Sequence, residues 1–143
     1  MTCATGIVER LFLVRWDEPV PSDVHRVVTE VGTASERLGQ KLYFIAVTPA
    51  NSKPPDEPTR RVFAANLPRL LERCESLHLI IEGTGFSSTV RRAVAAGLFL
   101  VSGKRKSMFV HDDIHAALEM TPYASRKLEI VTLARSQGIL QAA

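Results

Sequence analysis

The feature that most constrains the fold of this chain is a short apolar run, Leu42 to Val47, rich in β-branched and aromatic residues. A strand that is covered on both faces carries such a continuous run, whereas a half-exposed strand alternates apolar and polar residues. The run therefore predicts a central strand over Lys41 to Thr48. A loop with several prolines follows it. In α/β sheets, ligands and partners bind beyond the carboxyl ends of such strands, so this loop is the first candidate for a functional surface.

Three other segments have strand character. Leu77 to Ile81 and Ser107 to His111 are short and mostly apolar. Ile7 to Trp16 predicts a strand that bends at Glu9-Arg10 so that its first part pairs elsewhere, and Met1 to Gly6 is interpreted as a loose end.

The segments between these strands have helical apolar spacing and begin at residues that can cap a helix. The predicted caps are Ser22, Asp56, Ser87 or Ser88, and Asp112 or Asp113. Gly39 is expected to end the first helix in a left-handed conformation. Pro68 lies inside the second helix and is expected to kink it or split it near Asn66.

Strands that alternate with helices predict an α/β fold with a mostly parallel sheet of four to five strands. We expect a single domain over residues 7–120. Residues 121–143 add an extra amphipathic helix, Tyr123 to Ile139, and a tail.

Composition is that of an ordinary soluble domain. The 143 residues are 45% hydrophobic and 23% charged, with a net charge of +3. The basic run Lys104-Arg105-Lys106 is interpreted as a solvated turn, so we expect no nucleic-acid partner. No apolar run approaches the ~20 residues of a membrane span. Cys3 and Cys74 follow no disulfide or metal pattern, and with no signal peptide visible we expect a cytoplasmic protein.

A glycine turn follows the strand Leu77 to Ile81. Gly83, Thr84 and Gly85 resemble part of a phosphate-binding turn, but Ser88 stands where the dinucleotide fingerprint needs a third glycine. We therefore expect no nucleotide cofactor. The turn stays a candidate anion or small-ligand site, made of Gly83, Thr84, Gly85, Ser87 and Ser88.

The histidines give no convincing metal or catalytic site. His78 lies inside a strand and is expected to be a packed side chain. His111 and His115 have helical spacing, but a strand-to-helix boundary falls between them, so we expect no metal there. No nucleophile elbow is present, and we expect a protein that is not an enzyme and needs no cofactor.

The second half of the chain resembles the C-terminal part of STAS domains, which occur in anti-sigma-factor antagonists and sulfate-transporter tails. The resemblance lies in the strand Leu77–Ile81, the helix Val90 to Leu98 that ends at Gly-Leu, and the strand and helix Met108 to Glu119. It extends over about residues 7–120 and implies a STAS-like fold and a regulatory role in bacterial signalling.

The chain departs from the STAS pattern at the site where some family members are switched by phosphorylation. Family members that are switched by phosphorylation carry Asp-Ser-Ser/Gly-Gly after the central strand, and a partner kinase modifies a serine there. This chain has a longer, proline-rich loop in that place, with Ser52 and Thr59 as the nearby hydroxyls. Ser52 and Thr59 are thus the phosphorylation candidates that the resemblance implies.

The first functional hypothesis is contact with a regulatory protein partner, without catalysis. A stiff proline loop lowers the entropy that binding costs. The candidate contact residues are Ser52, Pro54, Pro55, Asp56, Thr59, Arg60 and Arg61.

Two alternatives stay open. The domain binds a small anion or lipid near Gly83–Ser88 or under the terminal helix, which a deep apolar pocket with converging polar groups would favour. The terminal helix Tyr123–Ile139 either packs on its own domain or forms a homodimer, because its apolar face must be buried.

Overall fold

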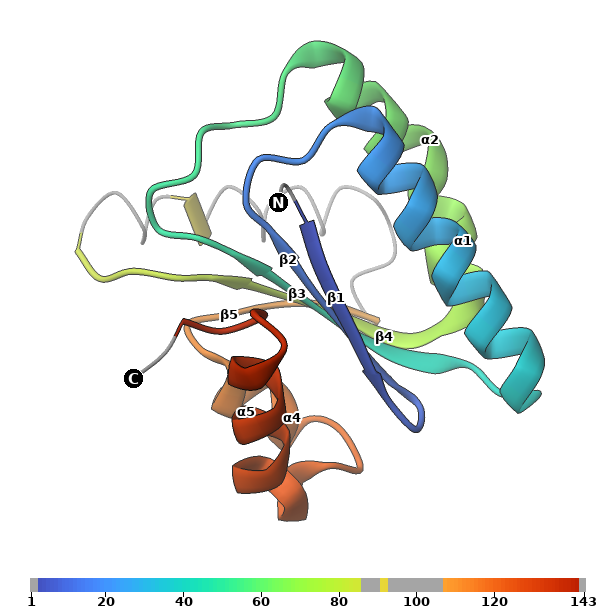
Figure 1. The fold of residues 1–143 in the computed structure, drawn as a ribbon, viewed down its shortest axis with the longest axis vertical. Coiled ribbons are helices and arrows are strands. Elements are labelled where there is room, and N and C mark those ends of the chain that lie inside the picture. The colour runs from blue at the N-terminus through green and yellow to red at the C-terminus, as the bar shows by residue number, and fades with distance from the viewer. Residues whose placement is uncertain (1–2, 86–90, 93–106, 142–143) are drawn as a thin grey trace.

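The computed structural model describes residues 3–85, 91–92 and 107–141 (Figure 1). Within this part of the chain, the centre is a five-stranded sheet with the order β1-β2-β3-β4-β5. Strands β2 to β5 are parallel, and β1 runs antiparallel to β2. The predicted α/β fold with a mostly parallel sheet is confirmed. The strands are β1 (Cys3–Val8), β2 (Leu11–Trp16), β3 (Leu42–Thr48), β4 (Cys74–Ile81) and β5 (Met108–His111).

The first strand corrects the predicted start of the fold. Residues from Cys3 belong to β1, so the loose end predicted for Met1 to Gly6 is wrong from that point on. β1 and β2 form a tight hairpin in which Val8 pairs with Leu11, and Glu9 in the turn has a positive φ of 54°. The bend expected at Glu9-Arg10 is therefore a complete reversal of the chain. Thr5 and Gly6 interrupt the apolar pattern of β1, which pairs with β2 along its whole length at the edge of the sheet.

In the part of the chain that the structure describes, two helices cover one face of the sheet. Helix α1 (Pro21–Leu38) connects β2 to β3, and α2 (Glu57–Arg73) connects β3 to β4. Crossovers between parallel strands are right-handed, so sequential strand order places both helices on the same face, as Figure 1 shows.

Helix α1 begins one residue before the predicted cap. Val20 is the N-cap residue, and its backbone N–H donates to the Asp23 carboxylate at 2.9 Å. Ser22 is therefore inside the helix, because Pro21 with its fixed φ takes the first helical position. Gly39 ends the helix at φ 64°, as predicted.

Helix α2 begins at the predicted residue but is not interrupted where a break was predicted. The Asp56 side chain accepts a hydrogen bond from the Thr59 backbone N–H at 3.0 Å. Pro68 lies inside the helix, which runs unbroken from Glu57 to Arg73. The predicted split near Asn66 is therefore wrong, and the Asn66 amide donates a further hydrogen bond to the Val62 carbonyl at 2.8 Å.

The C-terminal segments cover the opposite face (Figure 1). They are α4 (Ile114–Glu119), the 3-10 turn η1 (Ala124–Arg126) and α5 (Lys127–Ser136). Asp113 caps α4 by accepting from the Ala116 N–H at 2.9 Å. The regular helix is shorter than the predicted Tyr123–Ile139 because η1 precedes it and Gly138, at φ 76°, follows it.

Alternation along each strand creates two separate apolar layers. Phe12, Phe44 and Leu77 point toward α1 and α2, whereas Leu13, Ile45 and Ile80 point toward α4 and α5. The buried face of α5 joins the second layer, with Ile130 fully buried. The terminal helix thus packs on its own domain. The homodimer through Tyr123–Ile139 stays a prediction.

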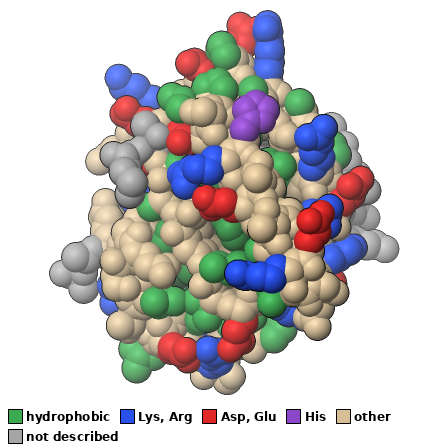
Figure 2. All heavy atoms as spheres, turned by 45° about the vertical axis from the view of Figure 1, so that its right-hand side comes forward, with side chains coloured by type: hydrophobic (Ala, Val, Ile, Leu, Met, Phe, Trp, Pro, Cys, Tyr) green, Lys and Arg blue, Asp and Glu red, His purple; other side chains and the backbone are tan. Residues whose placement is uncertain are grey.

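The surface charge is mixed. Figure 2 shows basic and acidic side chains interspersed over the face drawn there, in keeping with the net charge of +3. Among the described helices, none is both long and apolar enough to cross a bilayer. Of the helix predicted after Ser87 or Ser88, only Arg91 and Arg92 are described, and the basic run Lys104-Arg105-Lys106 lies outside the described residues.

Candidate functional site

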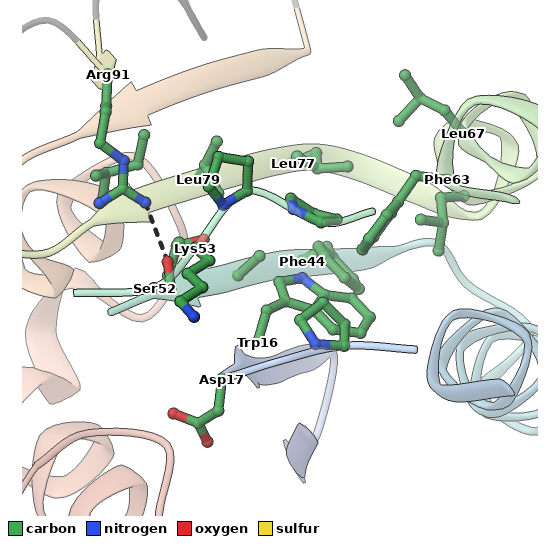
Figure 3. Close-up of a pocket in the computed structure, with 17 residues that line it drawn as sticks. Trp16, Asp17, Phe44, Ser52, Lys53, Phe63, Leu67, Leu77, Leu79 and Arg91 are labelled. Atoms are coloured by element: carbon green, nitrogen blue, oxygen red, sulfur yellow. Dashed lines mark hydrogen bonds between the residues drawn. The ribbon is translucent and has the colours of Figure 1, made fainter. Parts of the chain in front are cut away.

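An apolar cavity of about 460 Å³ lies on the α1–α2 face, beneath the proline-rich loop that connects β3 to α2 (Figure 3). We call it the proline-loop cavity. Side chains from β2, β3, β4, α2 and the loop line it. Its apolar lining consists of Trp16, Pro19, Phe44, Ala46, Pro54, Pro55, Phe63, Leu67, Leu70, Leu77, Leu79 and Ile81. Asp17, Thr48, Ser52, Lys53 and Arg91 add polar groups.

The strand period explains why the cavity exists. Phe44, Ala46 and Thr48 are alternate residues of β3 and lie on the same face of the sheet. Ala46 is the small member of this row. A larger side chain there would extend into the space between β3 and the loop, so the alanine helps to keep the cavity open.

Aromatic rings form one wall. Trp16, at the end of β2, meets Phe63 of α2 edge to face, with ring centroids 5.0 Å apart and an interplanar angle of 82°. Phe12 stacks on Phe44 with the ring centroids 5.6 Å apart, and this contact supports the Phe44 ring on the sheet side of the cavity. Such contacts hold rings in fixed orientations, so this wall is preorganised.

Arg91 holds the loop over the cavity. Its guanidinium donates to the carbonyl of Ala50 at 2.9 Å and to the hydroxyl of Ser52 at 3.1 Å. The Ser52 hydroxyl in turn donates to the Pro49 carbonyl at 3.0 Å. The loop has no regular structure of its own, and these bonds join it to a distant part of the chain.

Three of the polar groups lie together at one end of the cavity. Figure 3 shows Ser52, Lys53 and Arg91 at one end of the cavity and Phe63 and Leu67 at the other. The arrangement is therefore amphipathic, with an apolar interior and a polar mouth.

A buried arginine on the opposite sheet face pairs with the acidic lining residue. Arg15 is only 5% exposed, and its Nε lies 3.0 Å from the Asp17 carboxylate. The same guanidinium pairs with Glu82 at 2.9 Å and donates to the Ile139 carbonyl at 3.2 Å. Arg15 thus connects the end of β2 to the residue after β4 and to the C-terminal segment.

The structure divides the predicted contact residues into two groups. Ser52, Pro54 and Pro55 line the cavity. Asp56 caps α2, Arg60 donates to the Pro55 carbonyl at 2.8 Å, and Arg61 pairs with Glu57. None of Asp56, Arg60 and Arg61 lines the cavity.

The two phosphorylation candidates differ in exposure. Thr59 is completely buried, so its hydroxyl is inaccessible to a kinase in this conformation. Ser52 is half-buried and bonded to Arg91 and Pro49. Phosphorylation of either residue stays a prediction.

The glycine turn lies elsewhere. Gly83, Thr84 and Gly85 line a separate depression of about 660 Å³ with Asp112, His115 and Arg135, against α4 and α5. Gly83 and Gly85 have φ values of 106° and 93°, which glycine adopts without strain. Ser87 and Ser88 lie outside the described residues, so the candidate turn site is seen only in part.

The contact between two histidines, His78 and His111, was not predicted from the sequence. His78 is fully buried, and its Nδ1 lies 2.9 Å from Nε2 of His111 on the neighbouring strand. Its other nitrogen lies 2.8 Å from the Ser76 hydroxyl. Burial, with the His111 ring nearby, lowers the pKa of His78 to about 4. Burial also lowers the pKa of His111, against the opposing effect of Asp113 and Asp112.

Among the described residues, the histidine pair has no third side chain placed to hold a metal ion with it. The described part of the chain has no group of three or more His, Cys, Asp or Glu side chains placed to hold an ion. Ser76, His78 and His111 form a hydrogen-bonded polar group within the second apolar layer, and His78 is neutral at pH 7.

The parallel register was the signal that could have revealed the pair. His78 pairs with Phe109 and Ile80 with His111, so both histidines lie on one face, diagonally across β4 and β5. The sequence places both residues in strands but does not fix this register. The cavity could not be predicted from the sequence for a related reason, since Trp16, Ala46 and Arg91 come together only in the folded chain.

Comparisons with known proteins do not assign a family. The chain matches no family model, no curated protein and no solved structure. The STAS resemblance therefore stays a prediction, and the function is inferred from the site.

Proposed function

We propose that the protein binds a small, largely apolar molecule in the proline-loop cavity. The observation that carries this proposal is the cavity itself, with about 460 Å³ of space and an apolar lining that ends in a polar mouth. Pockets for small molecules typically enclose ~300–1,000 Å³ and combine apolar walls with a few placed polar groups. This is the feature that distinguishes the ligand hypothesis from the protein-contact hypothesis, although it lies away from the glycine turn where a ligand was expected.

Preorganisation supports the proposal. The Trp16–Phe63 contact fixes one wall, and the bonds from Arg91 fix the loop. A ligand that enters a preformed site does not have to order it, so less of the interaction energy is lost on binding.

The sole tryptophan of the chain provides a direct test, because Trp16 lines the cavity. Titration with decanol should change the intensity or wavelength of Trp16 emission in a saturable way. Ala46→Leu fills the cavity and should weaken decanol binding by about tenfold or more. Ala65→Leu is the matched control, because Ala65 is exposed on α2 and the variant should bind like wild type.

Folding of the variants is checked by circular dichroism, with Ala46→Val as a smaller step if Ala46→Leu unfolds. A saturable response that Ala46→Leu or Ala46→Val leaves unchanged would place the ligand elsewhere. No response to decanol or to longer alcohols would contradict the proposal.

Regulatory-protein contact is the second proposal, favoured by the exposed outer side of the same loop. Lys53, Pro54 and Asp56 are exposed, and Arg60 braces the loop at the Pro55 carbonyl. Deleting Ser52–Asp56 should then remove a partner captured from the protein's own host. Capture of the same partners by the deletion variant would contradict it.

A further inference from the structure

We infer that the ligand of the proline-loop cavity is a single-chain amphipathic anion, whose apolar body lies in the cavity and whose carboxylate lies beside Lys53. This inference rests on the proposed function and adds the chemistry of the head group.

The first step is the balance of charge at the mouth. Asp17 is the acidic residue of the described lining, and it shares the single charge of Arg15, 3.0 Å away, with Glu82. Lys53 is exposed, and within the described part of the chain its amino group has neither an ion pair nor a hydrogen bond. Within the described residues, the mouth therefore carries a lysine charge that is not paired with an acid.

The second step is the environment of Arg91. Among the residues that the structure describes, its hydrogen-bond acceptors are the carbonyls of Pro49 and Ala50 and the hydroxyl of Ser52. These acceptors are neutral, so they orient the guanidinium but do not balance its positive charge. Arg91 and Lys53 together make the polar end of the cavity electropositive.

The third step is the placement of this charge against the apolar interior. Ser52, Lys53 and Arg91 lie at one end and Phe63 and Leu67 at the other (Figure 3). Beside a low-dielectric wall, a charge interaction is stronger than in bulk water. An anion with an apolar tail complements both ends, whereas a purely apolar molecule would leave the cations without a partner.

A monoanionic carboxylate fits better than a phosphate. Asp17 also lines the cavity, and its charge is only partly balanced because Arg15 also pairs with Glu82, so a doubly charged phosphate would be repelled more strongly than a monoanion. Lys53 supplies a single point charge, and Arg91 keeps further N–H donors beyond those bonded to the loop.

The test compares decanoate with decanol on full-length wild type and on Lys53→Met, using Trp16 fluorescence and calorimetry. Lys53→Met should raise the Kd of decanoate about fivefold and leave the Kd of decanol within about twofold. Lys41→Met is the control, because Lys41 is exposed and does not line the cavity, and it should change neither Kd. Decyl phosphate, run in parallel, should bind less tightly than decanoate.

The outcomes separate the two proposals. If decanol binds and decanoate does not, or if Lys53→Met leaves the Kd of decanoate unchanged, the head-group inference is wrong and the apolar site remains. Equal weakening of both ligands by Lys53→Met would also overturn it, because it would show a structural role for Lys53. Tighter binding of decyl phosphate would replace the carboxylate with a phosphate. If neither decanol nor decanoate binds to wild type, both proposals fail.

Discussion

At the scale of single residues, the His78–His111 pair makes the stability of the fold depend on pH. A hydrogen bond between two imidazole rings needs one nitrogen to donate and the other to accept. When both rings are protonated, every ring nitrogen carries a proton and this bond is lost. The pair therefore stabilises the fold only when at least one ring is neutral.

This gives a prediction for the dependence of stability on pH. The pKa of His78 is about 4 in the folded state, compared with the ordinary value of 6.5. The unfolded chain thus binds more protons between pH 6.5 and 4, and the free energy of unfolding should fall as the pH falls through this window. The loss should be of the order of 3 kcal/mol, and urea denaturation at a series of pH values measures it.

His78→Phe should make this pH dependence much shallower, because it removes the group with the lowered pKa. His25→Gln is the control, since His25 is exposed on α1 and its replacement should leave the profile unchanged. An unchanged slope in His78→Phe would show that other groups cause the acid sensitivity.

Residue-scale predictions from sequence succeeded where the relevant interaction is local. Asp56 and Gly39 were assigned correctly because a helix cap depends on residues within one turn. The partner of His78 depends on the register between β4 and β5, and no local pattern encodes that register.

At the scale of elements, α2 is the clearest case of tertiary structure overriding a local preference. Proline inside a helix removes a backbone hydrogen bond and disfavours helical geometry in the preceding turn. Leu70 on the same helix is buried in the first apolar layer, and Phe63 and Leu67 pack against that layer. Packing on both sides of Pro68 therefore keeps the helix continuous.

Pro68→Ala should consequently stabilise the protein, by about 2 kcal/mol, because Pro68 is exposed and alanine restores the missing donor. The midpoint of urea denaturation should rise. Pro58→Ala is the matched control in the same helix, where the first turn tolerates proline and the change should stay below about 1 kcal/mol. A lower midpoint for Pro68→Ala would show that the proline ring itself makes a stabilising contact.

The hairpin of β1 and β2 shows where the hydrophobic pattern of the sequence fails to predict a strand. Leu11 to Trp16 is continuously buried and was recognised as a strand. β1 contains Thr5 and Gly6 and becomes partly exposed toward its end, so it lacks both the apolar run and the strict alternation that predict strands.

At the scale of the whole molecule, the sheet separates two layers with different roles. The α1–α2 layer contains the proline-loop cavity, and the α4–α5 layer is packed around Ile130 and Ile139. The order of elements in the sequence was sufficient to predict the α/β class, since alternating strands and helices imply parallel pairing. The cavity was not predictable, because its lining comes from five separate segments of the chain.

The second layer should contribute strongly to global stability. Ile130 is fully buried under the sheet, and Ile130→Ala should lower the free energy of unfolding by about 2–5 kcal/mol. Leu128→Ala is the matched control on the same helix, because Leu128 is 81% exposed and its loss should change stability by less than about 0.5 kcal/mol.

These two variants also test how α5 is buried in solution. Equal, large losses for Ile130→Ala and Leu128→Ala would indicate that the exposed side of α5 is covered by another copy of the chain. Light scattering on the full-length protein would then show a dimer.

The central claim is that the proline-loop cavity is a ligand site, and amide NMR spectra recorded during titration with decanol test it most directly. Decanol is neutral, so the result does not depend on the head-group inference. We predict saturable shift changes concentrated at Ala46, Ser52 and Leu79 and at the indole N–H of Trp16. Shifts confined to the opposite face, around His115 and Arg135, or no shifts at saturating decanol, would contradict the account.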